Sequence, residues 1–269
     1  MIRLKKEKES IQLNTEIEQI KVESMVQQIT IVATPFAKSE VILFHEGSKV
    51  TIELIVEENA NVGFVMVHGS MDCECCLNVH LKANANLNLG HVDLQDHVLN
   101  LKEQIDLDGE YAQVRLTSSC MAKSHHHFDV LMAHHGAYTS GIMNHYAVVY
   151  EQGNYRMVAD GHIDKGAVGA KSHQSTRVLT MSDKQKSEVI PILTIDENDV
   201  EASHAMSLGQ IDEMQAYYLQ SRGLTRMQAI GLLTVGYFMP IVEVVQDQEL
   251  QAVLRKIVQE KVGVSDEYN

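Results

Sequence analysis

From about residue 26 to about residue 205, short apolar runs alternate with turn residues, a pattern that favours β-strands over helices. Residues 50–56 (VTIELIV) and 114–117 (VRLT) are such runs, and Asp108 and Gly109 form one of the intervening turns. Many short strands with Gly, Asn and Asp turns are typical of a sandwich, a barrel or a β-helix. Periodicity leaves these three folds open, because no repeat of fixed length is apparent.

After about residue 210 the apolar spacing becomes helical. Asp212 is a candidate N-cap for a first helix, which Gly223 would end. Thr225 begins a second helix, with Gln228 at the reciprocal capping-box position. Apolar residues within 250–258 are spaced i, i+3, i+4, i+7, i+8 and predict a third helix.

These two patterns divide the chain into a β part, residues 1–210, and a three-helix tail, residues 211–269. The segment 1–25 fits either a strand pair or a short helix. The chain has 269 residues, 45% of them apolar, which is enough for a substantial core and argues against disorder. Mainly β structure with a small helical tail is therefore expected.

The net charge and the N-terminal sequence exclude several classes of partner and location. A formal charge of −14 repels phosphate backbones, so nucleic acid is not an expected partner. The N-terminal sequence, MIRLKKEKES, lacks the apolar segment of a secretory signal, and no long uninterrupted apolar run predicts a membrane span. We therefore expect a cytoplasmic protein with reduced cysteines and no contact with a membrane.

Residues 190–236 contain an ordered series of features that crosses from the strand pattern into the helix pattern. The series resembles the C-terminal signature of the SufB/SufD family of iron–sulfur cluster assembly scaffolds. Residues 173–179 (HQSTRVL) resemble the preceding strand of that family. The matching residues of the signature are Pro191, Leu193, Ile195, Asp199, Val200, Ser203, His204, Gly209, Ile211, Asp212, Tyr218, Leu219, Ser221, Arg222, Gly223, Leu224 and Ala229.

The resemblance implies a right-handed parallel β-helix body with a helical tail. It also implies dimerisation through the β-helix, either with a second copy or with a SufB/SufD paralogue, and binding of a SufC-like ABC ATPase. A transient iron–sulfur cluster would form at the dimer seam. By the same resemblance, the ATPase contact in the tail would comprise Tyr217, Tyr218, Leu219, Arg222 and Gly223.

The chain departs from the family pattern at three positions. Ser175 stands near the place of a functional SufB cysteine, Ala202 replaces a common SufD cysteine, and Ala205 replaces a SufB glutamate. Among the usual cluster-linked side chains only His204 is retained. An imidazole can bind iron, although a histidine that only makes a hydrogen bond at the seam fits equally well. The candidate seam residues are therefore His173, Ser175, Ser203 and His204.

Three cysteines lie close together at Cys73, Cys75 and Cys76. On a strand, Cys73 and Cys75 would share one face and Cys76 would lie on the other. Cys73 and Cys76 have the Cys-x-x-Cys spacing of metal sites, but no second pair exists to complete such a site. Small buried apolar residues are the favoured interpretation, and metal ligands the alternative.

The 14 histidines include His125, His126 and His127, the pair His134 and His135, and His145. On a strand, His125 and His127 would share a face, and a neighbouring coil could bring His134 or His135 beside them. Three imidazoles can hold a transition metal, so a metal-dependent β-helix or cupin-like enzyme that uses His125, His127 and His134 is the rival function. A solvent-facing polar ladder along stacked strands is the simpler alternative. A β-helix that serves only as an interaction module is a third hypothesis.

Catalytic motifs are absent from the sequence. It contains no Walker A motif, no Gly-x-Ser-x-Gly elbow and no Gly-x-Gly-x-x-Gly following a strand. We therefore expect a non-enzymatic scaffold that binds no nucleotide itself.

Overall fold

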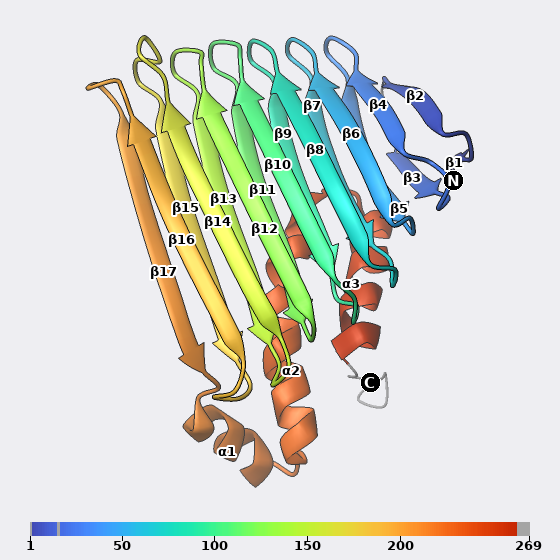
Figure 1. The fold of residues 1–269 in the computed structure, drawn as a ribbon, viewed down its shortest axis with the longest axis vertical. Coiled ribbons are helices and arrows are strands. Elements are labelled where there is room, and N and C mark those ends of the chain that lie inside the picture. Colours follow the sequence, from blue (N-terminus) through green and yellow to red (C-terminus); the bar gives the residue numbers. More distant parts are fainter. Residues whose placement is uncertain (1, 15–16, 263–269) are drawn as a thin grey trace.

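The computed structural model describes residues 2–14 and 17–262. Its strands form two parallel sheets (Figure 1). The first sheet has the order β1 (Ile2–Leu4), β3 (Ile17–Val22), β5 (Lys38–His45), β7 (Asn61–His68), β9 (Asn86–Asp93), β11 (Gln113–Ala122), β13 (Ser140–Val149), β15 (Lys171–Thr180), β17 (Glu201–Gln210). The second has the order β16 (Lys186–Ile195), β14 (Asn154–Ile163), β12 (His125–His134), β10 (Leu99–Leu107), β8 (Cys73–Leu81), β6 (Lys49–Val56), β4 (Gln28–Ala33), β2 (Lys8–Leu13).

Consecutive strands alternate between the two sheets, so the chain winds as a β-solenoid, and each coil contributes one strand to each sheet. The parallel β-helix that the family resemblance implied is therefore confirmed, and the sandwich and barrel alternatives are wrong. The first segment, left open between strands and a helix, forms strands β1 to β3.

The coils lengthen along the chain. Ile2 pairs with Ile20 in the first coil, whereas Asn154 pairs with Lys186 near the end of the β-helix, so the later coil uses a much longer stretch of chain. The strands also become longer along the chain, from three residues in β1 to ten in β17 (Figure 1). A repeat whose length changes from coil to coil gives no fixed period, which explains why periodicity alone did not select this fold.

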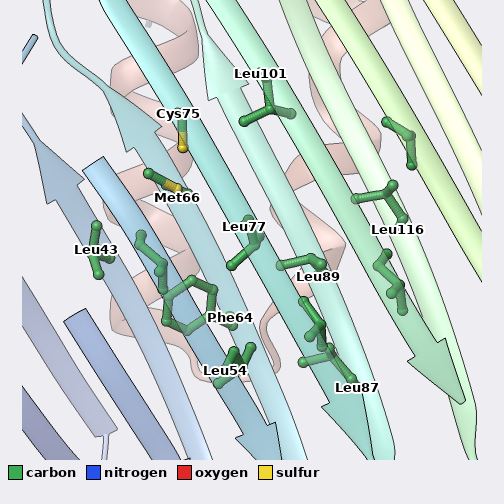
Figure 2. Packing of buried hydrophobic residues seen from close by; sticks show 14 of the residues in the cluster. Leu43, Leu54, Phe64, Met66, Cys75, Leu77, Leu87, Leu89, Leu101 and Leu116 are labelled. Atoms are coloured by element: carbon green, nitrogen blue, oxygen red, sulfur yellow. The ribbon is translucent and has the colours of Figure 1, made fainter. Parts of the chain in front are cut away.

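The interior is built from columns of side chains that stack from one coil to the next. Phe64, Leu89 and Leu116 are register partners on three neighbouring strands, and all three are fully buried (Figure 2). Inward and outward positions alternate along each strand, as the period-two pattern predicted. Burying each such side chain stabilises the fold by about 1.5–3 kcal/mol relative to exposure.

The tail consists of α1 (Glu213–Ser221), α2 (Arg226–Phe238), the 3₁₀ helix η1 (Met239–Val244) and α3 (Gln248–Val262). Asp212 caps α1 by accepting hydrogen bonds from the backbone N–H groups of the first turn. Thr225 and Gln228 form the predicted capping box of α2. The three predicted helices are thus confirmed.

The second half of the tail lies on the outer face of the first sheet and shares a core with it (Figure 1). Gly90 permits the close approach, since a Cβ there would lie 3.0 Å from Ile241 Cδ1. Glu40 of β5 accepts backbone hydrogen bonds from Gln246 and Asp247 at 2.8 and 2.6 Å. The buried apolar residues of this second core are Ile42, Val65, Val92, Leu94, Met121, Val148, Phe238, Ile241, Val242, Val244, Val245, Leu250, Leu254 and Val258.

One helical stretch, Arg226–Val244, is long and apolar enough by length and composition to cross a membrane, although no such span was expected from the sequence. The stretch is 19 residues long, and 39% of its most apolar 18-residue window is buried. Phe238 and Ile241, within it, are fully buried in the second core. Its apolar character is therefore explained at least partly by packing against the first sheet.

Candidate functional site

The predicted seam residues lie on β15 and β17, the last two strands of the first sheet. His173 and Ser203 are register partners, and His173 Nδ1 lies 2.8 Å from Ser203 Oγ. Ser175 is the partner of Ala205 on the same outer face, beside Tyr237 of α2 in a shallow pocket. The structure therefore brings three of the four candidates onto one face.

His204 points the other way. Its register partner is Gln174, which is buried in the interior of the β-helix, so His204 also faces inward. It is nevertheless exposed, because β17 belongs to the last coil of the described residues and no further coil covers it there. Within one chain His204 is thus separated from Ser175 by the thickness of the sheet. Sequence reasoning placed them together because it identified their strands but not which face each side chain occupies.

The last coil leaves apolar side chains uncovered. Ile195 of β16 and Met206 and Leu208 of β17 continue the inward-facing columns, yet they are 40%, 55% and 49% exposed. Strands β16 and β17 are also edge strands of the two sheets, as β1 and β2 are at the other end of the β-helix. An exposed edge that carries apolar side chains is a template for pairing with another chain.

A second exposed apolar surface lies on α1 and the start of α2, which project beyond the β-helix (Figure 1). Met214, Tyr217, Tyr218 and Met227 are 73%, 68%, 56% and 83% exposed. A shallow groove on this surface is lined by Met214, Gln215, Tyr218, Leu219 and Leu233.

The end of α1 fixes the geometry of this surface. Gly223 has a φ of 101°, a conformation that strongly favours glycine. Its N–H donates to Gln220 O at 2.9 Å, and the N–H of Leu224 donates to Leu219 O at 3.3 Å, which together form a Schellman motif. The Arg222 guanidinium lies 5.2 Å from the Tyr218 ring centroid, within cation–π range.

The cysteines take the faces that the strand pattern predicted. Cys73 and Cys75 are buried inside the β-helix, whereas Cys76 is half-buried on the outer face. Opposite faces prevent Cys73 and Cys76 from chelating one ion. Burial raises the pKa of Cys73 to about 12 and that of Cys75 well above its usual range, so both remain neutral thiols in the absence of a metal.

The histidines of β12 do not form the predicted metal group. His125 and His127 lie on the outer face, where they contact Asn154 and Arg156. His134 is inward, fully buried at the far end of the strand. The alternation of faces along a strand therefore separates the three imidazoles that the rival enzyme hypothesis required.

His135 belongs instead to a solvent-facing ladder across the second sheet. Its ring nitrogens lie 2.6 Å from Asp164 Oδ2 and 3.0 Å from Asp106 Oδ1, on the two neighbouring coils. His80 and His162 extend the same ladder of histidines and aspartates. This arrangement matches the simpler alternative of a polar ladder along stacked strands.

Sequence reasoning missed a cluster of polar side chains inside the middle coils. It contains His45, His68, His91, Asp93, His97, Glu103, His126 and His145, each at most 3% exposed. A signal was present in the sequence, since His45, His68 and His91 recur at a constant spacing. This spacing equals the coil register between β5 and β7, where His45 and His68 are partners, whereas the partner of His91 on β7 is Met66.

Burial dominates the electrostatics of this interior. It lowers the pKa of His45 to about 4, and that of His68 and His145 to about 3. Asp93 is the exception: burial alone would raise its pKa, but the imidazoles of His126 and His97 hold the pKa well below its usual range. Burial alone would likewise lower the pKa of His97, but its contact with Asp93 raises it. Asp93 is therefore the anionic centre of the cluster.

Two sheets of parallel strands wound as a solenoid, with a helical hairpin projecting from the last coil, place the chain in the class of β-helical proteins. Within that class, the model of the family described as "SUF system FeS cluster assembly, SufBD core domain" matches residues 15–237. The chain therefore belongs to the SufBD family, whose role is in iron–sulfur cluster assembly. The match extends far upstream of the signature in residues 190–236.

Curated relatives agree with this assignment. The iron–sulfur cluster assembly protein SufD of Bacillus subtilis is 31% identical over 155 residues, which cover 58% of this chain and 36% of that protein. SufD of Escherichia coli is 27% identical over 171 residues, covering 62% and 40%. A SufBD family protein of Archaeoglobus fulgidus is 34% identical over 104 residues, covering 39% and 28%. The alignments with these relatives thus span at most two fifths of their length.

Proposed function

We propose that this chain is a non-enzymatic scaffold of a SUF-type iron–sulfur cluster assembly complex. It joins a second β-helix through its last coil and binds a SufC-like ABC ATPase through α1 and the start of α2. One observation carries the proposal: in a chain of the SufBD family, exposed apolar side chains gather at the free edge of the last coil and on the projecting helices. Exposed apolar patches of this kind mark interaction sites.

The last coil supports dimerisation. Met206 and Leu208 continue the interior columns of the β-helix and stop at an open end, and the backbone edge of β17 is free for pairing. A second β-helix, either another copy or a SufB/SufD paralogue, would cover both the edge and the side chains. A symmetric contact would bring one His204 from each subunit to the same seam.

The projecting helices support ATPase binding. Tyr217 and Tyr218 are exposed although aromatic residues are costly to leave in water, and tyrosine is enriched at interface cores. The Schellman motif at Gly223 ends α1 at a fixed point, which orients Arg222 over Tyr218. This chain would hold the transient cluster as cargo and leave nucleotide to its partner. The cytoplasmic location stays a prediction.

ATPase binding is tested with full-length chains by calorimetry, using the SufC-like ATPase of the same organism. The double variant Tyr217→Ala/Tyr218→Ala should weaken binding by on the order of 100-fold, because two central aromatic anchors are lost. Removal of the whole tail is a poorer test, since it would also uncover the second core. Circular dichroism should show an unchanged fold, because both rings are exposed.

A matched control is available at the opposite edge of the β-helix. Tyr111 and Tyr138 are 49% and 51% exposed and stack on each other with ring centroids 5.1 Å apart. The double variant Tyr111→Ala/Tyr138→Ala should bind the ATPase as the wild type does. Equal affinity of the Tyr217/Tyr218 variant and the wild type would refute the proposed contact.

A further inference from the structure

The interior cluster contains four potential metal ligands from separate segments of the chain. Asp93 ends β9, and its register partner Cys120 lies on β11 of the same sheet. His126 projects inward from β12 on the opposite sheet, and His97 comes from the connection between β9 and β10. One ligand atom from each of Asp93, His97 and His126 lies within 4.8 Å of the others. All four residues are at most 3% exposed.

His97 is already oriented as a metal-binding histidine would be. Its Nδ1 lies 2.6 Å from the carbonyl oxygen of Met71 and therefore carries the proton that it donates. Its Nε2 then faces Asp93 Oδ1 at 2.7 Å. Metal-bound histidines commonly donate their second N–H to a backbone carbonyl in this manner, which fixes the tautomer and the ring orientation.

His126 supplies an independent observation. Its Nε2 lies 3.2 Å from Asp93 Oδ2, but the ring is not aligned for a hydrogen bond, and neither ring nitrogen has a hydrogen-bond partner among the described residues. A buried imidazole whose Nδ1 has no partner and whose Nε2 makes only an ion-pair contact costs free energy, so its retention beside a carboxylate needs an explanation. An ion shared with Asp93 and His97 would use the Nε2 lone pair.

Charge balance favours a dication with a thiolate as the fourth ligand. Cys120 Sγ lies 4.0 Å from Asp93 Oδ2, next to but outside the group of three residues whose ligand atoms all lie within 4.8 Å of one another. A divalent ion bound by two neutral imidazoles, one carboxylate and one thiolate forms a group without net charge, which a dry interior tolerates far better than an isolated ion. Nitrogen, oxygen and sulfur ligands in this number are those that Zn²⁺ and Co²⁺ prefer in tetrahedral sites.

We propose that Asp93, His97, His126 and Cys120 form a binding site for one divalent first-row transition-metal ion, with Zn²⁺ as the reference ion, inside the β-helix. Binding displaces to solvent the thiol proton of Cys120 and the proton that His97 Nε2 shares with Asp93 Oδ1, and no electron is transferred. The site is independent of the proposed function, because it lies in the middle coils rather than at the last coil or on α1. Bound ion would tie the two sheets together across the interior.

The ion reaches the site through the short connection at residues 94–98, which carries His97 and which local opening can expose. Loading during refolding provides a second route, because ligands bind as they are brought together. Both routes are used in the experiment.

The test is titration of the metal-free, full-length protein with Co²⁺, followed by visible and near-ultraviolet absorption. We expect one Co²⁺ per chain, with tetrahedral d–d bands and a thiolate-to-cobalt charge-transfer band. Zn²⁺ should displace the Co²⁺ and raise the melting temperature. A wild-type chain that takes up no Co²⁺, either in its native state or during refolding, overturns the proposal.

Variants locate the ion. Asp93→Asn and His126→Gln should each reduce Co²⁺ affinity at least 100-fold, and Cys120→Ser should remove the charge-transfer band while d–d bands persist. His134→Gln is the matched control: His134 is a fully buried histidine of the same strand with an unpaired Nε2, and this variant should bind Co²⁺ as the wild type does. If Asp93→Asn and His126→Gln fold and still bind one Co²⁺ with wild-type affinity, the site lies elsewhere.

Discussion

The middle coils and the last coil of the β-helix depart from ordinary packing in opposite senses. In the middle coils, polar side chains such as His68, Asp93 and His145 occupy inward positions where apolar residues would pack. In the last coil, Met206 and Leu208 occupy the same inward columns and remain exposed. The two regions therefore share one backbone architecture, but the middle coils bury polar side chains and the last coil exposes apolar ones.

This contrast separates two kinds of constraint. Buried polar groups destabilise a fold unless they are paired, so their presence indicates a requirement within the chain. Exposed apolar groups at a free edge cost little to one chain but favour association with another. The middle coils are thus expected to govern the stability of the subunit, and the last coil its assembly. Each prediction below changes one region and measures the property that this region should govern.

The largest effect is expected from acidification, which acts on the middle coils. Burial lowers the pKa of His134 to about 4 and that of His145 to about 3, from 6.5 in the unfolded chain. Below pH 6.5 the unfolded chain binds protons that the folded chain excludes, which favours unfolding. The free energy of unfolding is therefore unaffected by these two rings above pH 6.5, and it decreases as the pH falls towards 4 for His134 and 3 for His145. Each histidine contributes on the order of a few kcal/mol, against a total stability of about 5–15 kcal/mol.

Urea unfolding at pH 7.5, 6.0 and 5.0 measures this loss. The variant His134→Gln/His145→Gln should show a much shallower pH dependence, because almost two fewer protons are taken up on unfolding at pH 5. Neighbouring His135 and His91 are retained, so their charges contribute equally to both proteins. His125→Gln, at an exposed position, is the control and should keep the wild-type slope. An unchanged slope in the double variant would contradict the assignment of acid sensitivity to these rings.

An intermediate effect is expected at the last coil. Leu208→Lys places a charge where a second β-helix would pack, and it should weaken association by on the order of 100-fold because that charge loses its water at the interface. The melting temperature of the isolated subunit should change little, since Leu208 is already 49% exposed. Sedimentation of the chain, alone and with a SufB/SufD paralogue, measures the association.

The opposite end of the β-helix supplies the control. Ile17 of β3 is 59% exposed in the first coils, so Ile17→Lys makes the same kind of chemical change away from the proposed interface. It should leave association unchanged. If both lysine variants associate as the wild type does, the last coil is not the interface.

Sequence reasoning succeeded where a local pattern is sufficient. Thr225 and Gln228 predicted a helix start because a capping box is complete within a single helical turn. The strand pattern assigned Cys73 and Cys75 to one face for a similar reason, since side chains alternate along any strand. The β-helix itself came from family resemblance, because coils of unequal length have no common period.

It failed where the answer depends on which strands are neighbours. His134 was expected on a coil beside that of His125 and His127, but all three lie on β12, and His204 and Ser175 lie on opposite sides of one sheet. Asp93 and Cys120 meet only because β9 pairs with β11, one coil further along the chain. Register between coils therefore determines both candidate sites, and a single sequence does not specify it.

The smallest effect on stability is expected from His204→Ala. Compared with Cys73→Ser, this change also distinguishes the last coil most sharply from the middle coils. Its side chain is exposed at the open end, so His204→Ala should keep the melting temperature within about 2 °C of the wild type, as usual for surface substitutions. Cys73 is buried, with Sγ 3.7 Å from His45 Nδ1, and Cys73→Ser places a hydroxyl in the interior at a cost of about 1–3 kcal/mol. His204→Ala should therefore have the smaller effect on stability and the larger effect on cluster assembly, and Cys73→Ser the reverse.

Anaerobic reconstitution on the complex with its ATPase and paralogue, followed by iron and sulfide analysis, measures the second property. If clusters form at the seam, His204→Ala loses the cluster and keeps its stability, because an imidazole from each subunit is removed from one shared site. Cys73→Ser and Cys75→Ser then lose stability and keep the cluster, since their thiols face the interior of a single chain. The reverse result, with normal reconstitution in the histidine variant and none in folded cysteine variants, would move cluster assembly from the last coil to the middle coils.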